Sequence, residues 1–284
     1  MTPSKTAHKK TILRAKAVRK NQIVTLLTDF GTIDGYVGAM IGSILHYAPN
    51  ILPISISHEV PSFDVEHAAY IGKTAWSYFP KGTIHIAVVD PGVGTLRRPL
   101  AINKQGNIYI GPDNGIFTSV LRGKRSVRVI DFKRLGFSEP SATFHGRDVF
   151  APVAGLLAAG KISFHSLGVV LSDPILLPVW RVEITKDKIE CYVIHVDRFG
   201  NAILGIEDKV ANEFRKNHGL VAVLPSGEII QRSRSYGDVS SGKALLLTGS
   251  SGHLEIAICE GSAAATLGLL RGTKIILRRV KGNC

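Results

Sequence analysis

The sequence predicts a two-part α/β protein, with a mainly parallel sheet flanked by helices at the N-terminus and a β-rich barrel or sandwich at the C-terminus. Strand-like and helix-like stretches alternate from residue 23 onward, which is typical of a parallel sheet with helices on its faces. Residues 84–89 are almost all apolar, as buried parallel strands tend to be. After Pro178 the pattern changes to short β-rich runs separated by Gly- and Ser-rich turns.

The N-terminal elements are expected within a domain spanning residues 23–180. A first strand at 23–27 leads to a helix at 36–47, and a strand at 52–56 leads to a helix at 65–79, for which Asp64 is well placed as N-cap. The remaining elements of this domain are the strands 84–89, 100–102, 108–110 and 127–130 and a helix at 150–159.

A second domain is expected over residues 188–284. Its predicted strands are 189–196, 202–206, 220–224, 229–231, 244–248, 254–258 and 274–278.

The composition is that of an ordinary soluble globular protein, with 45% hydrophobic and 20% charged residues. No apolar run approaches the about 18 residues of a membrane span. Seven Lys and Arg residues precede the first acid, Asp29, and removing them from the net charge of +13 leaves +6. We therefore expect residues 1–22 to be a disordered basic tail, with at most nonspecific contact to nucleic acid.

The cysteines indicate the compartment. Cys191, Cys259 and Cys284 are odd in number and far apart, which predicts neither a disulfide framework nor a zinc site and favours the reducing cytoplasm.

Two acids follow predicted strands at the edge of the sheet where ligands bind in parallel folds. Asp29, after the first strand, suits either the hydroxyls of a ribose or the cap of the helix that begins at Tyr36. Asp90 opens the loop Asp90-Pro91-Gly92-Val93-Gly94-Thr95-Leu96-Arg97, whose glycines permit tight turns. The loop brings a carboxylate near a guanidinium, either in a site or as a surface ion pair.

Two further clusters carry polar chemistry. Phe144-His145-Gly146-Arg147-Asp148 precedes a helix N-terminus, where polar ligands bind readily, although Asp148 could simply cap that helix. Asp197-Arg198-Phe199-Gly200-Asn201 lies between two strands, and its Gly-Asn pair is also good turn chemistry.

Two apparent motifs are rejected. Residues 237–244 approach a phosphate-binding loop, but Ala244 lacks the hydroxyl that binds magnesium and a strand follows. His58-Glu59 lacks the H-E-x-x-H spacing because residue 62 is Ser. We therefore expect no metal and no cofactor.

The ordered set of motifs resembles the S-adenosylmethionine hydrolase (adenosine-forming) family, formerly a domain of unknown function and related to fluorinating and chlorinating enzymes. The set comprises residues 27–31, 34–38, 90–97, 111–115, 144–148, 197–201 and 254–257, and the resemblance spans residues 23–279. It implies hydrolysis of S-adenosylmethionine to adenosine and methionine. It also implies a homotrimer whose active sites lie between the N-terminal domain of one subunit and the C-terminal domain of a neighbour.

The resemblance also implies roles for individual residues. Asp90, Arg97 and His145 would be catalytic. Asp29 would hold the ribose hydroxyls, and Phe63 would pack near the sugar. The C-terminal half would contribute Asp197, Phe199 and Asn201 to the adenosine and amino-acid portions, Ser250 and Glu255 to the methionine end, and backbone near Ile258 to the adenine.

Residue differences separate water from halide as the nucleophile. The halogenating relatives resemble this chain but carry tyrosine where Asp90 stands, and the fluorinating one has serine where Gly146 stands. A carboxylate repels a halide and can accept a hydrogen bond from water, so we expect hydrolysis. A non-catalytic sensor of adenosine or S-adenosylmethionine is the main alternative, and a halogenating enzyme is a further one.

The chain departs from the family pattern at three places. Leu204-Gly205 stands where Thr-Asn is usual, Ile41 replaces a lysine, and Gly249 replaces an asparagine. The first and third departures are expected to alter how the methionine end is held.

Overall fold

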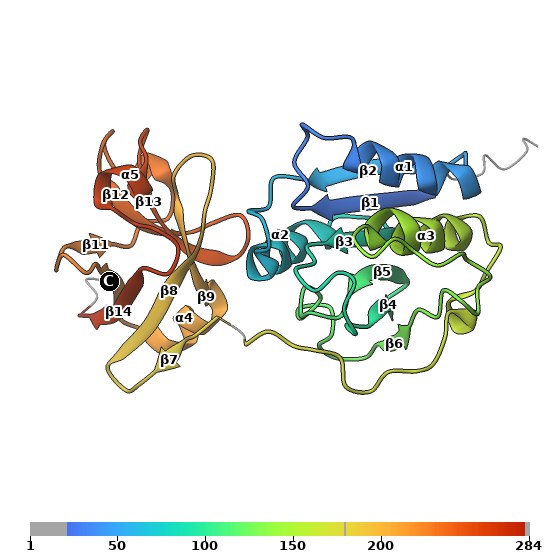
Figure 1. The fold of residues 1–284 in the computed structure, drawn as a ribbon. Helices are drawn as coiled ribbons and strands as arrows, with labels where there is room; N and C mark the ends of the chain where they lie inside the picture. Colours follow the sequence, from blue (N-terminus) through green and yellow to red (C-terminus); the bar gives the residue numbers. More distant parts are fainter. Residues whose placement is uncertain (1–21, 179, 282–284) are drawn as a thin grey trace, which may run out of the picture.

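A computed structural model describes residues 22–178 and 180–281, which form two lobes with one sheet each (Figure 1). The fold class expected from the sequence is confirmed. The exact domain limits stay a prediction, and the predicted basic tail falls, except for Gln22, outside the described residues.

The N-terminal sheet has six strands in the order β2-β1-β3-β5-β4-β6. β1 is parallel to β2 and to β3, and β3 is parallel to β5. β4 is antiparallel to both its neighbours, β5 and β6. β4 reverses because only Gln105 and Gly106 join it to β5, and both have positive φ, as a tight hairpin turn requires. The strands are β1 (Ile23–Thr28), β2 (Leu52–Ser57), β3 (Ile84–Val88), β4 (Pro99–Lys104), β5 (Asn107–Pro112) and β6 (Ser126–Val129).

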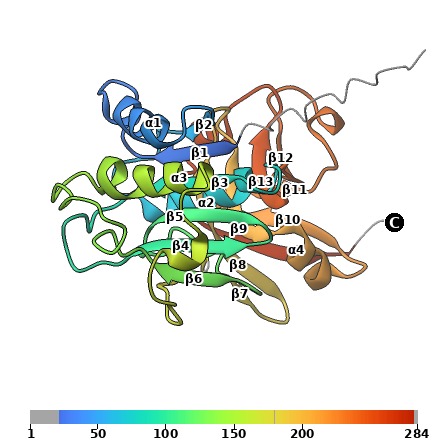
Figure 2. The same cartoon turned by 90° about the vertical axis from the view of Figure 1, so that its right-hand side faces the viewer.

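Helices cover both faces of this sheet. α1 (Tyr36–Tyr47) and α3 (Ala151–Ala158) pack together on one face, as both ribbon views show (Figures 1 and 2), and α2 (Val65–Trp76) packs on the other. The side chain of Asp64 accepts a hydrogen bond from the backbone N of His67 at 3.0 Å, which confirms it as the N-cap of α2. A short π-helix, η1 (Gly146–Phe150), leads into α3, and a 3-10 turn, η2 (Phe164–Ser166), follows it.

The C-terminal sheet is antiparallel throughout, in the order β11-β10-β14-β8-β9-β13-β12, with β7 beside β8. All seven strands expected there are present, as β8 (Lys188–Val196), β9 (Ala202–Glu207), β10 (Gly219–Val223), β11 (Ile229–Gln231), β12 (Ala244–Thr248), β13 (His253–Ile258) and β14 (Lys274–Val280). In this lobe, the elements without a counterpart in the sequence prediction are β7 (Glu183–Ile184), α4 (Asp208–Arg215), η3 (Tyr236–Asp238) and α5 (Ala263–Leu267).

The missed helices are short, but α5 did carry signals. Ser262 caps it by accepting a hydrogen bond from the backbone N of Ala265 at 3.1 Å, and Gly268 ends it in the left-handed conformation. α4 spans only eight residues, so its apolar stripe is too brief to reveal a period.

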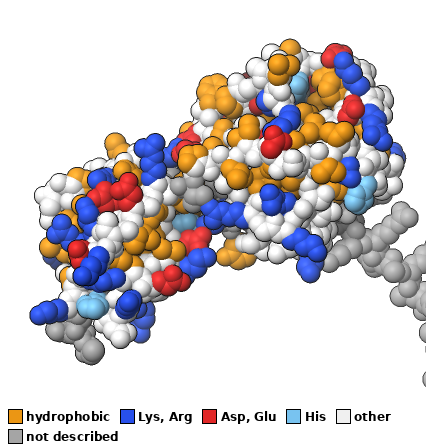
Figure 3. Space-filling view, turned by 90° about the horizontal axis from the view of Figure 1, so that it is seen from below, with side chains coloured by type: hydrophobic (Ala, Val, Ile, Leu, Met, Phe, Trp, Pro, Cys, Tyr) orange, Lys and Arg blue, Asp and Glu red, His pale blue; other side chains and the backbone are white. Residues whose placement is uncertain are grey.

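Helix α2 also joins the two lobes. Tyr70 packs with Ile194 and Ile203 of the C-terminal lobe and with Trp180 of the segment that connects the lobes. Lys73 Nζ lies 2.7 Å from Glu207 Oε1, and Arg271 forms ion pairs with the acids at the start of the helix. Seen from below, the two lobes meet at a narrow junction, with basic and acidic side chains interspersed over this face (Figure 3).

Among the helices of the described residues, none combines the length and the apolarity that a membrane crossing requires.

Candidate active site

The loop after β3 places a buried ion pair at the edge of the N-terminal sheet. Arg97 Nε donates to both oxygens of Asp90, at 3.0 and 2.9 Å, and Arg97 Nη2 lies 2.5 Å from Asp90 Oδ2. The two side chains are only 6% and 9% exposed. The alternative of a surface ion pair is therefore wrong. Gly94 (φ 76°) lets the loop pack against the carbonyl of Ala142, where a Cβ would collide.

His145 extends this pair into a chain of three groups. Arg97 Nη2 donates to His145 Nδ1 at 2.7 Å. A neutral imidazole that accepts at Nδ1 carries its proton on Nε2. Burial, reinforced by the positive charge of Arg97, lowers the pKa of His145 below 6.5. The neutral ring therefore presents an N–H donor at neutral pH.

A pocket of about 300 Å³ adjoins these groups and is lined by Asp29, Phe63, Asp90 and His145, among others. Phe30, Tyr36 and Phe144 form an aromatic wall, with ring centroids 5.3–6.0 Å apart in edge-to-face geometry. Gly146 closes the pocket tightly, since a Cβ there would lie 3.2 Å from Met40 Sδ. The pocket thus combines two carboxylates, an imidazole and flat apolar surfaces.

Asp29 faces this pocket and does not cap a helix. Its Oδ2 accepts a hydrogen bond from the backbone N of Phe63 at 2.9 Å, and the N-cap of α1 is Gly35. Phe63 has φ 67°, a left-handed conformation that is rare for an aromatic residue, and its side chain is 70% exposed. A strained backbone therefore projects an exposed ring at the rim of the pocket.

The turn between β8 and β9 forms a second polar group in the C-terminal lobe. Asp197 Oδ1 accepts hydrogen bonds from the backbone N of Phe199 at 2.9 Å and of Asn201 at 2.8 Å. Asn201 Nδ2 donates to Asp197 Oδ2 at 3.0 Å. This bonding rigidifies the turn and leaves the ring of Phe199 78% exposed.

Tyr236, which the sequence analysis did not single out, joins Glu255 to this turn. Its hydroxyl donates to Glu255 Oε1, and Asn201 Nδ2 lies 3.4 Å from the same hydroxyl. Burial, with the charge of Asp197 adding to it, raises the pKa of Glu255. No spacing in the chain links Tyr236 to residues 19 and 35 positions away, so only the fold reveals it.

The family departures fall in different surroundings. A Cβ at Gly249 would collide with the carboxylate of Glu255, so the glycine and the position of that carboxylate depend on each other. Leu204 is fully buried in the C-terminal core, and Gly205 packs against Trp180. Ile41 packs against the core of the N-terminal lobe. Gly249 is therefore the departure with a direct bearing on a predicted site residue.

Ser250 lies just before β13, and Ile258 is the last residue of this strand. Ser250 is exposed in the turn before this strand, and Ile258 is buried at its end. Ile258 lies on the same strand as Glu255, and Ser250 lies in the turn that joins β12 to this strand.

The predicted residues therefore gather in two groups. Among the described residues, no hydrogen bond or ion pair connects the Asp90 pocket with the turn at Asp197, and the pocket is lined by N-terminal residues alone. One chain does not bring the two groups into a single cavity.

Metal binding finds no support in residues 22–178 and 180–281, where no cluster of three or more His, Cys, Asp or Glu could hold an ion. His58 instead bonds to Thr28 Oγ1 at 2.9 Å and Ser55 Oγ at 2.8 Å. Ala244 begins strand β12, in agreement with the rejection of a phosphate-binding loop.

The fold and the pocket define an α/β protein with a C-terminal antiparallel sheet and a small-molecule site beyond the carboxyl end of β3. Comparison with known families is more specific. The chain matches the SAM hydroxide adenosyltransferase N-terminal domain over residues 24–168 and the corresponding C-terminal domain over residues 191–276. It belongs to this family.

Individual relatives agree with that membership. The chain is 36% identical to the (R)-S-adenosyl-L-methionine hydrolase of Methanocaldococcus jannaschii, covering 86% of this chain and 91% of the relative. It is also 36% identical to the protein of that name from Thermus thermophilus, covering 89% and 98%. A fluorinase of Nocardia brasiliensis is 24% identical, covering 90% and 96%.

Solved structures share the fold. A conserved protein from Thermotoga maritima superposes with a TM-score of 0.83 and 31% identity, over 90% of this chain and all of that one. A conserved protein from Thermus thermophilus gives a TM-score of 0.71 and 34% identity, over 91% of this chain and all of that one.

Proposed function

We propose that this protein hydrolyses S-adenosyl-L-methionine at ribose C5′, giving adenosine and L-methionine. The observation that carries the proposal is the buried Asp90–Arg97–His145 chain in the wall of the small pocket. The relatives named (R)-S-adenosyl-L-methionine hydrolase support the same reaction.

The chemistry needs little beyond a well-placed water. The oxygen of water forms a bond to C5′ while the C5′–S bond breaks and its electron pair returns to sulfur, so methionine leaves as a neutral thioether. No acid has to protonate the leaving group. Holding water in line with the C5′–S bond supplies several kcal/mol through orientation alone.

Asp90 and His145 are proposed to hold that water. The carboxylate accepts a hydrogen bond from it, and the neutral imidazole offers its Nε2–H to the water oxygen. Arg97 fixes both groups through the bonds described above. With no metal to lower the pKa of water from about 15.7, the water attacks before it is fully deprotonated, and its proton passes to Asp90 and then to solvent.

Specificity against halide follows from hydrogen bonding. The Asp90 carboxylate accepts hydrogen bonds and offers no proton to a chloride or fluoride, whereas it can accept one from water, and Arg97 already holds its charge. We therefore expect water to be the nucleophile even in the presence of chloride.

The remaining contacts to the substrate are proposed first for the Asp90 pocket and then for the C-terminal residues around Asp197. Asp29 accepts hydrogen bonds from the ribose hydroxyls, and Phe63 packs against the sugar. On the C-terminal side, Asp197, Phe199 and Asn201 contact the adenosine and amino-acid portions, while Ser250, Glu255 and backbone near Ile258 hold the methionine end and the adenine.

Because these two groups do not meet within one chain, we propose a homotrimer in which the C-terminal group of one subunit completes the Asp90 pocket of its neighbour. The exposed rings of Phe63 and Phe199 are suited to burial at such a junction. Mixing an inactive Asp90→Ala protein with an inactive Asn201→Ala protein, after subunit exchange, should restore activity in hybrid sites. No restored activity in verified hybrids would refute the shared site.

We propose no cofactor and no metal for the reaction. Cys191 and Cys259 are free thiols, which favours a reducing, cytoplasmic location.

The test is to incubate the purified protein with each sulfonium epimer of S-adenosylmethionine, with and without chloride, and to separate the products by chromatography. Equal amounts of adenosine and methionine, independent of chloride, are expected. A 5′-chloroadenosine peak would refute the exclusion of halide. Tightly bound S-adenosylmethionine without turnover would instead favour a sensor.

A further inference from the structure

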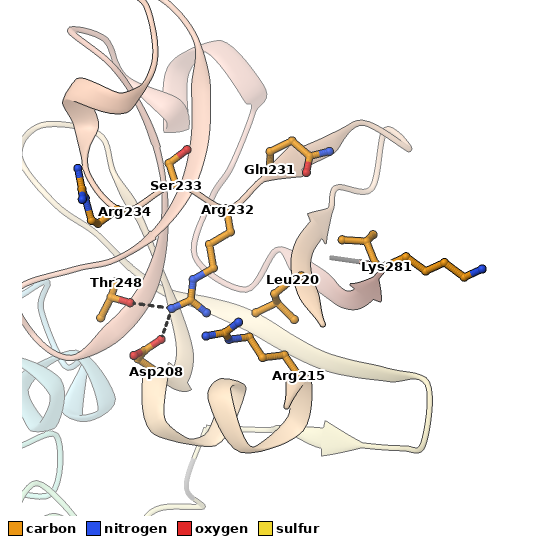
Figure 4. Close-up of a pocket in the computed structure, with 11 residues that line it drawn as sticks. Asp208, Arg215, Leu220, Gln231, Arg232, Ser233, Arg234, Thr248 and Lys281 are labelled. Atoms are coloured by element: carbon orange, nitrogen blue, oxygen red, sulfur yellow. Dashed lines mark hydrogen bonds and ion pairs between the residues drawn. The ribbon is translucent and has the colours of Figure 1, made fainter. Parts of the chain in front are cut away.

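A second cavity, of about 820 Å³, lies in the C-terminal lobe and is strongly basic (Figure 4). Four cationic side chains and a single carboxylate line it: Arg215, Arg232, Arg234, Lys281 and Asp208. None of these residues belongs to the Asp90 pocket or to the group around Asp197. The proposed hydrolysis therefore leaves this cavity without a role.

Two of the guanidinium groups converge. Arg215 Nε donates to Asn212 Oδ1 at 2.7 Å, and Arg232 Nη1 lies 3.4 Å from that same oxygen. Since both nitrogens reach one neutral atom, two positive charges are held close together. Like charges at such separation repel, and the repulsion is relieved when an anion binds between them.

The carboxylate in the cavity neutralises only one of these two charges, that of Arg232. Asp208 Oδ1 lies 2.6 Å from Arg232 Nη2, and Asp208 Oδ2 accepts a hydrogen bond from Asn212 Nδ2 at 2.7 Å. Both oxygens of Asp208 are thus engaged. The other bond of Arg215, 3.2 Å long, goes to the carbonyl of His218, which carries no net charge.

Local structure accounts for only part of the basic set. Arg215 ends α4, where a cation complements the free carbonyls of the helix. Arg232 is tied to Asp208 and to Thr248 Oγ1, the latter at 3.2 Å. Arg234 is 91% exposed at the rim and lies 3.6 Å from Asp238. Lys281 borders the same hollow.

We propose that this cavity binds a small ligand that carries two or more phosphate groups. Guanidinium groups match phosphate oxygens with paired N–H donors, and Lys281 adds a point charge. Ser233 and Gln231 also border the cavity, with their side chains turned away from Arg232 (Figure 4). A cavity of this size suits a compact ligand, whereas a nucleic-acid strand is bound along an extended groove.

The test uses the full chain and inorganic tripolyphosphate as the probe, with binding measured by isothermal titration calorimetry at low ionic strength. We expect one saturable site per chain, with at least ten-fold higher affinity than for orthophosphate. Arg215→Gln should weaken tripolyphosphate binding at least ten-fold. Lys281→Gln, on the exposed rim, should weaken it several-fold and serves if the first variant does not fold.

Lys186→Gln is the matched control, because Lys186 is an exposed lysine between β7 and β8, outside the cavity, and its loss changes the net charge equally. It should change affinity less than two-fold. The basic residues before position 21 are present in every variant, so their attraction for anions cancels in the comparison.

Three results would overturn the proposal. One is the absence of saturable binding, and another is an equal loss of affinity in Lys186→Gln and Arg215→Gln. The third is a single-stranded oligonucleotide that binds more tightly than tripolyphosphate and is weakened equally by Arg215→Gln. Since binding is measured without S-adenosylmethionine, the outcome does not depend on the proposed hydrolysis.

Discussion

Replacing Asp90 with asparagine removes one charge and almost no volume. It should break the hydrogen bonds that link Asp90, Arg97 and His145. Arg97 donates to both carboxylate oxygens. Whichever way an asparagine amide is turned, its NH₂ group therefore faces an N–H of Arg97. The guanidinium would be left buried without its counter-charge and would be free to withdraw from His145.

The structure sets the expected magnitudes. Because both partners are less than one-tenth exposed, losing the pair should cost about 3 kcal/mol of unfolding free energy, the lower part of the range for buried pairs. Loss of the carboxylate that we propose holds the attacking water should lower kcat about 10²- to 10⁴-fold. The dissociation constant for S-adenosylmethionine should change little, because the proposed binding contacts lie elsewhere.

A second ion pair provides the control. Asp113 pairs with Arg98 at 2.6 Å and is 2% exposed, yet it does not line the Asp90 pocket. Asp113→Asn should therefore destabilise the fold, by less than Asp90→Asn because Arg98 is 33% exposed and also pairs with Asp173, and should leave kcat nearly unchanged. Chemical denaturation, steady-state kinetics and calorimetric titration separate the three quantities. A folded Asp90→Asn protein whose kcat stays within ten-fold of the unaltered protein would refute the assignment of Asp90.

Two further outcomes are expected. Gly249→Ala should displace the carboxylate of Glu255. Losing one hydrogen bond of about 1 kcal/mol between this carboxylate and the substrate should raise KM about five-fold. An unchanged KM would show that Glu255 does not bind the substrate. Burial lowers the pKa of His85 to about 3 and that of His253 to about 4, so both stay neutral in the folded protein while the unfolded chain binds protons below about 6.5. Their contribution to stability is complete above pH 6.5 and is lost as the pH falls toward 4, by up to about 1.4 kcal/mol per pH unit for each. A free energy of unfolding, measured in urea, that does not change between pH 7 and pH 5 would contradict this.

The sequence predicted most elements because their signals are local. The helix 36–47 agrees residue for residue with α1, and Asp64 caps α2 through a contact only three residues away. The predicted helix 65–79 overran by three residues, since α2 ends at Trp76. The reversal of β4 was not predicted, because the two-residue turn at 105–106 was not read as a hairpin.

The site was predictable only in part, since its contacts are long-range. The seven-residue spacing of Asp90 and Arg97 made their pairing plausible, but its burial depends on packing from other segments. The contact from Arg97 to His145 spans 48 residues and carries no sequence signal of its own. The same holds for Tyr236 and Glu255, which are brought together by strand pairing and a 3-10 turn.

The backbone of Phe63 has a consequence for how this protein tolerates change. A left-handed phenylalanine costs on the order of 1–3 kcal/mol, and the fold bears this cost to hold an exposed ring. Glycine at position 63 would relax the chain and make it harder to unfold, but it would remove that ring. Under the proposed role of Phe63 beside the sugar, selection for stability and selection for ligand affinity therefore act in opposite directions here. A heat-resistant variant obtained by screening for stability alone should tend to acquire glycine at this position and to lose activity with it.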